Sequence, residues 1–324
     1  MDRDCSYRKI FIVGCPRSGT TWVTKMIAQH PATIGFPSET HLFKLLFDPF
    51  TYLPQWNWQK RFEQKSWIFK HYGLKPIFLG FHSHDIWQGF ERIYKLYQNS
   101  PAKVGPHNCV DYREFKSLIQ QAKNSQDCDL IKVKKTIALI WDKGFYNRGG
   151  DREKIMIEKT PMHIRYADII LNYFPEARII EVVRDVRAVC ASWQARSQKA
   201  KWANKETKDI IKQWIRCIEF GEKCRADDTI ADRIYRIQYE DLRSQTFFYL
   251  KEIFDFTHLS TEDSAIEEII EKNDISKVAK KGQGEHVSKG TIGSWRNDLS
   301  ESDIQLCHAL AGPLLEKLGY SVTL

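Results

Sequence analysis

A short stretch near the N-terminus constrains the fold more than any other part of the chain. Four apolar residues, Ile10–Val13, predict a buried strand, and a turn containing Gly, Pro and Ser follows it directly. Apolar side chains at helical spacing then predict a helix over Thr20–His30. In such a strand–loop–helix unit, free N–H groups and the positive end of the helix dipole point into the loop. The stretch therefore predicts an anion site. An ordinary strand-to-helix turn is the alternative, which the run of Pro, Arg, Ser, Gly and two Thr disfavours.

The loop follows the phosphate-loop template except at one position. Gly14 and Gly19 have the template spacing, but Thr20 stands where the template has its lysine, and the fixed cation is Arg17 inside the loop. In nucleotide hydrolases, that lysine and a hydroxyl-bound Mg²⁺ serve a pair of β- and γ-phosphates. A kinase that uses ATP, with Asp185 as a Mg²⁺ ligand, is therefore disfavoured. Asp185 is instead expected to cap a helix or to form a salt bridge.

Composition and charge exclude several other classes of protein. The 324 residues are 42% apolar and 13% aromatic, which is typical of a globular chain. The formal charge of +8 indicates an anionic ligand, and no zinc-finger, RNA-recognition or basic-arm pattern points to nucleic acid. The eight cysteines form no C-x-x-C pair, and the polar start Met1–Lys9 does not resemble a secretory leader, so we expect reduced thiols and a cytoplasmic location. No apolar run reaches the roughly 18 residues of a membrane span.

Strand and helix patterns alternate along the rest of the chain. This alternation predicts an α/β fold with a doubly wound, mostly parallel sheet that binds ligands at the carboxyl ends of its strands. The expected strands are Ile155–Pro161 with its terminal loop, Ala177–Val183 and Ile234–Gln238, and the expected helices are Tyr166–Phe174, Val186–Arg196, Asp209–Cys224, Thr261–Asn273 and Glu301–Leu318.

Residues 44–129 differ in character from the rest of the chain. They are crowded with aromatic residues and show no strand alternation, which favours a mostly helical insertion on the acceptor side. The core of a plain helical subdomain is the alternative interpretation. We therefore expect one domain over residues 1–324, with its nucleotide core at about 7–43 and 130–324.

Several segments resemble one enzyme family. The loop Pro16-Arg17-Ser18-Gly19-Thr20-Thr21-Trp22 is similar to the 5′-phosphosulfate loop of sulfotransferases that use 3′-phosphoadenosine 5′-phosphosulfate (PAPS). The pair Arg184 and Ser192 resembles the family's Arg-x₇-Ser pattern for the 3′-phosphate. Residues 288–297 resemble its Arg-Lys-Gly-x-x-Gly-x-Trp-Lys segment, except that Ser288 replaces the first Arg. The site features are closest to those of tyrosylprotein and carbohydrate sulfotransferases.

The resemblance implies a set of donor-binding residues. Arg196 is expected to compensate for the cation missing at Ser288, and Tyr239 resembles the tyrosine that packs near the adenine, with plain core packing as its alternative. The full set is Pro16, Arg17, Ser18, Gly19, Thr20, Thr21, Trp22, Arg184, Ser192, Arg196, Tyr239, Lys289, Gly290 and Trp295.

The resemblance also implies the catalytic groups. Arg17 is expected to bridge the 5′-phosphate and the sulfuryl group, because a guanidinium stays charged and offers a planar fork of donors. Lys159, in Glu-Lys-Thr-Pro, resembles the lysine that reaches the sulfuryl group, with an exposed loop lysine as the alternative. Glu39 lies in the chain where tyrosylprotein sulfotransferases have their catalytic glutamate, and His41 is the second candidate base. A merely structural role is the alternative for both.

These inferences together predict a sulfotransferase of one reaction type. It would move a sulfuryl group from PAPS to a hydroxyl, or an amino group, of a small-molecule or carbohydrate acceptor, leaving 3′-phosphoadenosine 5′-phosphate (PAP). We expect no metal, no nucleic-acid partner, no membrane span, and a monomer or homodimer. A P-loop-type kinase and a non-catalytic protein that binds PAP or a polyanion are the alternatives. The sequence leaves the acceptor open.

Overall fold

The computed structural model describes most of the chain outside residues 44–90. The described residues are 8–43, 91, 94, 95, 97–99, 104–126, 129–198, 200, 204–259, 261–274 and 291–322. Two compact units are present, which we call the first unit (Met1–Cys5 and Ile34–Asp151) and the second unit (Ser6–Thr33 and Arg152–Leu324). Each is considered by itself below. Most of the predicted insertion over residues 44–129 lies outside the described residues.

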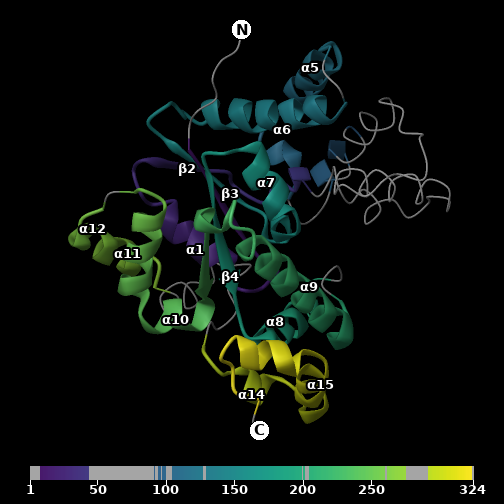
Figure 1. Cartoon of the computed structure of the whole chain (residues 1–324), viewed down its shortest axis with the longest axis vertical. Coiled ribbons are helices and arrows are strands. Elements are labelled where there is room, and N and C mark those ends of the chain that lie inside the picture. The colour runs from purple at the N-terminus through teal and green to yellow at the C-terminus, as the bar shows by residue number, and fades with distance from the viewer. Residues whose placement is uncertain are drawn as a thin grey trace, which may run out of the picture. The chain divides into compact units, whose positions relative to one another are not determined.

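A parallel sheet is the framework of the second unit (Figure 1). Its strands are β1 (Lys9–Gly14), β3 (Ile155–Lys159), β4 (Ala177–Val183) and β5 (Ile234–Gln238), and with β2 (Thr33–Gly35) the strand order is β2-β3-β1-β4-β5. β1 pairs in parallel with both β3 and β4, and β4 pairs in parallel with β5. The carboxyl ends of these four strands therefore meet at one edge, which is where such sheets bind ligands. The predicted mostly parallel α/β fold is confirmed.

Helices cover both faces of this sheet. In Figure 1, α1, α11 and α12 lie on one side of the strands, and α8 and α9 lie on the other. The helices of the second unit are α1 (Thr20–Ile27), α7 (Ala167–Tyr173), α8 (Val186–Ser197), α9 (Thr207–Arg225), α10 (Tyr239–Ser244), α11 (Thr246–Phe256), α12 (Asp263–Lys272), α14 (Trp295–Asp298) and α15 (Glu301–Lys317), with 3₁₀ turns η3 (Pro161–Tyr166) and η5 (Ala231–Arg233).

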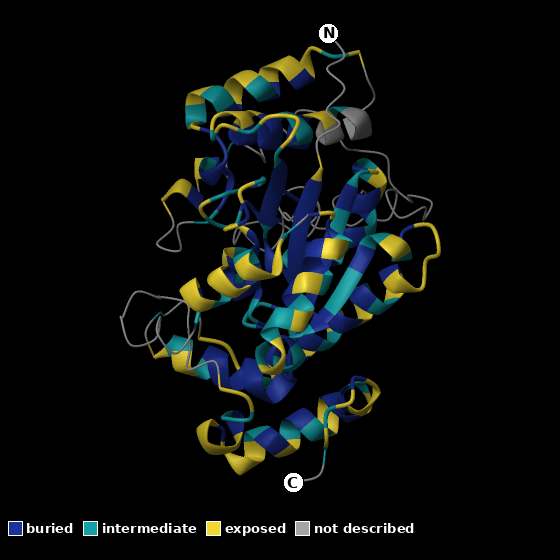
Figure 2. Cartoon of the chain, turned by 90° about the vertical axis from the view of Figure 1, so that its left-hand side faces the viewer, coloured by how far each residue is buried: buried dark blue, intermediate teal, exposed yellow. Residues whose placement is uncertain are grey.

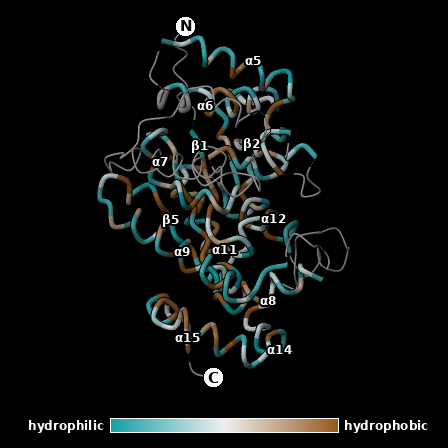
Figure 3. Tube along the Cα trace, turned by 90° about the vertical axis from the view of Figure 1, so that its right-hand side faces the viewer, coloured by the Kyte–Doolittle hydropathy of each residue, from teal (hydrophilic) through white to brown (hydrophobic). Residues whose placement is uncertain are grey.

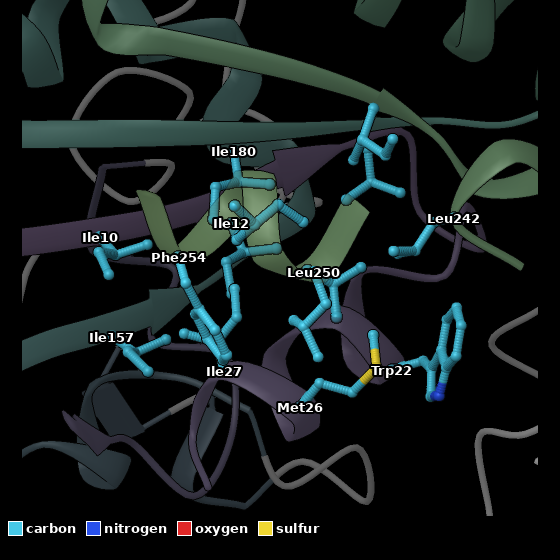
Figure 4. Packing of buried hydrophobic residues seen from close by; sticks show 14 of the residues in the cluster. Ile10, Ile12, Trp22, Met26, Ile27, Ile157, Ile180, Leu242, Leu250 and Phe254 are labelled. Carbon is cyan, nitrogen blue, oxygen red and sulfur yellow. The ribbon is translucent and has the colours of Figure 1, made fainter. Parts of the chain in front are cut away.

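The sheet is buried because its strands carry apolar side chains on both faces. On one face, Ile12 and Ile180 belong to a buried cluster with Met26 of α1 and Phe254 of α11 (Figure 4). On the other face, the ring of Phe11 stacks on Phe174 with 6.3 Å between ring centroids. The inner strands β1, β3 and β4 are accordingly almost wholly buried and dark blue in Figure 2, whereas β5 at the edge of the sheet is partly teal. In Figure 3, the trace at β1 is hydrophobic. This core holds the carboxyl edge of the sheet in place.

Apart from residues 34 and 35 of β2, the regular elements described in the first unit are helical. It contains the 3₁₀ turn η2 (Pro106–Asn108) and the helices α5 (Tyr112–Lys123) and α6 (Asp129–Tyr146). Asp111 caps α5 by accepting a hydrogen bond from the backbone N–H of Glu114 at 2.8 Å. Tyr94 lies against Phe115 with 4.6 Å between ring centroids, so aromatic side chains form part of the core of this unit.

Several helices differ from the sequence-based expectation: α6, α10 and α14 were not predicted, and α1 and α11 differ as follows. The first helix ends at Ile27 rather than His30, and His30 lies instead in the turn before β2, where its backbone carbonyl accepts a hydrogen bond from the Thr33 hydroxyl at 2.8 Å. α11 was not predicted, because aromatic residues surround it and hide the helical spacing of its buried side chains Leu250, Ile253 and Phe254.

Candidate active site

The loop between β1 and α1 has a tight backbone that only particular residues can adopt. Gly14 has φ 143°, and a Cβ there would lie 2.3 Å from the Val182 carbonyl oxygen of β4. Gly19 has φ 95° at the N-cap of α1, and Arg17 has φ 78° between them. The Ser18 N–H donates to the Cys15 carbonyl oxygen at 3.1 Å and closes the turn. The first turn of α1 therefore points into a compact loop, as anion sites require.

The two predicted anion pockets adjoin each other. The Arg17 Nε donates to the Ser192 Oγ at 3.0 Å, which joins the loop to α8. From the end of β4, the Arg184 Nη1 donates to the Arg17 carbonyl oxygen at 3.2 Å. Parallel strands produce this meeting, because both segments leave the same edge of the sheet. Arg17, Arg184 and Ser192 thus form one basic cluster.

Two buried donors of this cluster have no partner within the part of the chain that the structure describes. Among the described residues, neither the Ser18 hydroxyl nor the Arg184 Nε has a hydrogen-bond partner, and both atoms are buried. Buried polar groups are almost always paired in native proteins, so such atoms call for an explanation. A phosphate or sulfuryl oxygen would satisfy both, and the residues present therefore fit an anionic nucleotide.

Tyr239, the first residue of α10, packs against the basic cluster. Its ring lies 4.4 Å from the Arg184 guanidinium carbon, and a Cβ on Gly19 would approach the ring to 2.3 Å. Trp22 meets the same ring edge-on, with 5.8 Å between centroids. Burial raises the pKa of Tyr239, although Arg184 and Arg243 lower it. The ring therefore packs between the loop and Arg184, and a contact with adenine remains a prediction.

Lys159 ends β3 at the same edge of the sheet. Its backbone lies opposite Ile12 of β1 in the strand register, and the residue is half-buried. The residues on either side are fixed: the Thr160 hydroxyl donates to the buried Glu158 carboxylate at 2.6 Å, and His163 Nδ1 lies 3.0 Å from the other Glu158 oxygen. Lys159 therefore leaves the sheet from a rigid turn beside the β1 loop.

The two candidate bases form a pair in the first unit. The His41 Nε2 lies 3.0 Å from a Glu39 carboxylate oxygen, and 24% of the Glu39 side chain is exposed compared with 9% for His41. The imidazole stacks on Tyr97 with 5.2 Å between centroids and an angle of 11° between the rings. The Gly105 N–H donates to the Glu39 carbonyl oxygen at 2.6 Å. Both side chains are thus held in one defined arrangement.

The structure describes some of the remaining predicted donor residues but not others. Arg196 is half-buried in the last turn of α8, and Trp295 is buried in α14. Lys289 and Gly290 lie outside the described residues. Asp185 caps α8 through the N–H of Arg187 at 2.8 Å, as expected. None of these observations tests a contact with the nucleotide.

One buried cation next to the site was missed by sequence reasoning. Arg187 is 2% exposed and forms several contacts around the turn between β4 and α8. Its only signal in the sequence is a second arginine three residues after Arg184, which also fits an exposed helical position.

The described residues contain neither a candidate metal centre nor a candidate membrane-spanning helix. In that part of the chain, no group of three or more His, Cys, Asp or Glu side chains is arranged to hold a metal ion. Over the same residues, no helix combines the length and the apolar character needed to cross a bilayer.

The chain is similar to one protein family in sequence and to several solved structures in fold. The family model described as the sulfotransferase family matches residues 9–263. Comparison with curated proteins gives no match. The sulfotransferase domain of the Synechococcus PCC 7002 olefin synthase is 19% identical with a TM-score of 0.50, and the alignment covers 98% of this chain and 96% of that one.

Two further structures are similar at lower scores. Sulfotransferase STF9 from Mycobacterium avium is 13% identical, with 98% of this chain and 78% of that chain covered and a TM-score of 0.49. A mouse sulfotransferase crystallised with PAP is 14% identical, with 97% and 85% covered and a TM-score of 0.46. The cyanobacterial domain supports the sulfotransferase fold. Because the family match spans most of the chain, the enzyme class that the motifs predicted is confirmed, and the protein belongs to the sulfotransferase family.

Proposed function

We propose that this sulfotransferase transfers a sulfuryl group from PAPS to a hydroxyl or amino group of a small-molecule or carbohydrate acceptor and releases PAP. One observation carries the proposal. Arg17 of the phosphosulfate-type loop contacts Ser192, while Arg184 donates to the Arg17 carbonyl oxygen, so the residues for both phosphates of PAPS form one cluster.

The charges of the donor account for the composition of this cluster. PAPS carries a 5′-phosphosulfate and a 3′-phosphate, and guanidinium groups bind such anions with two donors in a fixed plane. We assign the 5′-phosphosulfate to Arg17 and to the Pro16–Trp22 loop, including the buried Ser18 hydroxyl. We assign the 3′-phosphate to Arg184 and Ser192, with Arg196 and the Lys289-Gly290 segment as additional groups.

The reaction is an in-line displacement at sulfur. A new S–O bond forms from the acceptor oxygen while the S–O bond to the 5′-phosphate breaks, and negative charge develops on the leaving phosphate. Fixed cations stabilise this charge without reorganising during the reaction. Arg17 would neutralise the leaving phosphate, and Lys159 would neutralise the sulfuryl oxygens. A rigid turn that fixes Lys159 suits this role, because electrostatic stabilisation requires positioned charges.

The proton of the acceptor requires a base. We assign this role to Glu39, whose carboxylate is partly exposed and is oriented by His41 at 3.0 Å. A carboxylate oriented by an imidazole can accept a proton at one oxygen while the other retains its hydrogen bond. His41 remains the second candidate base. In that alternative the imidazole accepts the proton and the Glu39 carboxylate orients the imidazole, and mutating each residue in turn distinguishes the two assignments.

We also propose a cytoplasmic location. The described cysteines Cys15, Cys109, Cys190, Cys217, Cys224 and Cys307 are all free thiols and all buried. Free thiols are typical of reducing compartments, which supports this assignment.

Ligand-dependent stabilisation tests the donor assignment. Thermal unfolding is measured with PAP, with ADP and with Mg²⁺–ATP, and we expect PAP to raise Tm most because only PAP carries a 3′-phosphate. Ser192→Ala should weaken PAP binding by about 10-fold, because a hydrogen bond to a charged group is lost. Ser197→Ala is the matched control, since Ser197 lies on the same helix and donates to the Gln194 carbonyl oxygen. Stronger stabilisation by Mg²⁺–ATP would instead indicate a kinase.

Incubation with PAPS tests the reaction itself. A panel of phenols, sugars and amines is screened by mass spectrometry for the gain of one SO₃ group. PAP release coupled to a sulfated product is the expected result. PAP binding without product from any acceptor class would favour the non-catalytic alternative.

A further inference from the structure

Arg187 is a buried cation at the start of α8, next to the proposed donor site. We propose that it is a positioning residue: it holds the Arg184 turn and the Trp295 segment together and thereby sets the affinity for the 3′-phosphate. This inference rests on the proposed function, because both segments are assigned to that phosphate.

On one side, Arg187 fixes the turn that carries Arg184. Its Nε and Nη2 donate to the two carboxylate oxygens of Asp185 at 3.0 and 2.7 Å, and its backbone N–H donates to the same carboxylate at 2.8 Å. The backbone N–H of Asp185 in turn donates to a Glu240 carboxylate oxygen at 3.2 Å. Asp185, which follows Arg184, is therefore fixed by the guanidinium of Arg187, by the backbone N–H of Arg187 and by the Glu240 carboxylate.

On the other side, Arg187 contacts the C-terminal part of the chain. The indole ring of Trp295 in α14 lies 4.0 Å from the guanidinium carbon. The Nη1 donates to the Ser321 carbonyl oxygen at 2.8 Å and lies 3.0 Å from the His308 Nε2 of α15. Trp295 belongs to the predicted motif over residues 288–297, so Arg187 joins the Arg184 turn to a residue of that motif.

Only an arginine can make this set of contacts at once. The guanidinium donates within its plane to Asp185, Ser321 and His308 and presents its flat face to Trp295. A lysine would keep the charge but would lose both the bidentate pair and the stacking face. Arg187→Lys therefore removes the connection and conserves the net charge, which separates positioning from long-range electrostatics.

The experiment compares two nucleotides that differ in one phosphate. Calorimetry gives Kd for PAP and for AMP, which lacks the 3′-phosphate, with the wild type and with Arg187→Lys. We expect PAP to bind about 10- to 100-fold more weakly to the variant, because small misplacements at a charged site have effects of this size. The AMP affinity should stay unchanged. In turnover assays, KM for PAPS should rise while kcat at saturating PAPS is retained.

A matched control separates this effect from a general loss of stability. Arg233→Lys also removes a guanidinium that joins two segments: the half-buried Arg233 donates to the carbonyl oxygens of Leu171 and Pro175 at 2.9 and 3.1 Å before β5 begins, at the opposite edge of the sheet. It should lower Tm and leave the ratio of PAP to AMP affinity unchanged. Should Arg187→Lys fail to fold, Asp185→Asn weakens the bidentate pair with Arg187 and should lower the same ratio.

The outcomes distinguish this inference from the proposed function. A folded Arg187→Lys protein with the wild-type ratio of PAP affinity to AMP affinity would overturn the positioning role, whether both affinities are unchanged or both fall equally. A wild type that does not prefer PAP to AMP would instead overturn the proposed donor assignment.

Discussion

At the residue scale, the backbone of Arg17 is the most informative single feature. Its φ of 78° lies in the left-handed region, which few residues other than glycine adopt. Such a conformation costs on the order of 1–3 kcal/mol and persists where the surroundings fix it. Here the contacts to Ser192 and from Arg184 do so. His41, with φ 53°, is a second such residue, and it also belongs to a predicted catalytic group.

A pair of substitutions separates strain from function at Arg17. Arg17→Gly and Arg17→Ala both remove the guanidinium, so both should lose turnover by about 10³-fold or more. Glycine adopts positive φ freely, whereas alanine is strained there, so the Gly variant should be more stable than the Ala variant by about 1 kcal/mol. Urea unfolding and PAPS turnover measure the two effects. Equal stability of the two variants would show that the loop relaxes, and retained turnover would remove Arg17 from the site.

Lys159 allows a second test at this scale. Lys159→Met removes the charge proposed to neutralise the sulfuryl oxygens and keeps most of the side-chain volume. We expect kcat to fall by about 10²- to 10³-fold, as for other groups that stabilise developing charge, with the PAP affinity retained. Lys154→Met is the control, because Lys154 precedes the same strand and donates to the Pro31 carbonyl oxygen on the surface. Unchanged turnover in Lys159→Met would make Lys159 a plain loop lysine.

At the element scale, a charged pair lies within the sheet. Glu181 is 1% exposed in the middle of β4, and Arg236 lies opposite it in β5, donating to its carboxylate at 2.8 and 3.0 Å. Gly221 of α9 leaves the space for that carboxylate, since a Cβ there would lie 2.0 Å from it. The buried Glu181 carboxylate thus depends on the charge of Arg236 in β5 and on the space beside Gly221 in α9.

Removing one partner should therefore be costly. Arg236→Met leaves Glu181 buried without its main counter-charge, which typically destabilises by about 3–5 kcal/mol. Burial already raises the pKa of Glu181, and Arg236 lowers it, so its pKa should rise further in the variant. A raised pKa means that stability is lost as pH rises above the ordinary glutamate value of 4.5. The stability gap between wild type and variant should therefore widen from pH 4 to pH 7.

Denaturant unfolding from pH 4 to pH 7 measures this difference in stability between the wild type and Arg236→Met. Lys251→Met is the control, because Lys251 pairs with Asp263 at 2.6 Å on the surface, where ion pairs contribute little to stability. A gap that does not depend on pH would show that Glu181 stays ionised in the variant, through water or another cation.

The pair of Glu181 and Arg236 shows which features of the strands and helices could be predicted from the sequence and which could not. The strand Ala177–Val183 and the unit from Ile10 to the first helix were predictable, because local apolar spacing defines them. The partner of Glu181 was not, since it lies 55 positions away in the chain. The contact between Arg17 and Ser192 belongs to the same class: parallel topology places both at one edge, but only the folded chain gives their 3.0 Å separation. Arg187 was missed because its partners Trp295 and Ser321 are similarly remote.

At the scale of the whole molecule, the proposed roles divide between the two units. The proposed donor residues Arg17, Arg184 and Ser192 belong to the second unit, whereas the proposed bases Glu39 and His41 belong to the first. The motifs predicted the donor side in detail, because the 5′-phosphosulfate and 3′-phosphate require cations at fixed places. The acceptor was not predictable, since residues 44–129 carry aromatic side chains but no motif that specifies one chemical group.

This division predicts that donor binding and proton transfer can be separated by mutation. Glu39→Gln removes the proposed base without altering the unit that holds the donor residues, so the Kd for PAP should stay unchanged. Turnover should fall by about 10²- to 10⁴-fold, the usual contribution of a general base. His41→Gln should have a smaller effect if His41 only orients Glu39, because a glutamine can still donate a hydrogen bond. Glu114→Gln, in the same unit with its carboxylate near Asn147 at 3.2 Å, is the control. A larger loss in His41→Gln than in Glu39→Gln would make the imidazole the base, and full turnover in both variants would place the base elsewhere in the chain.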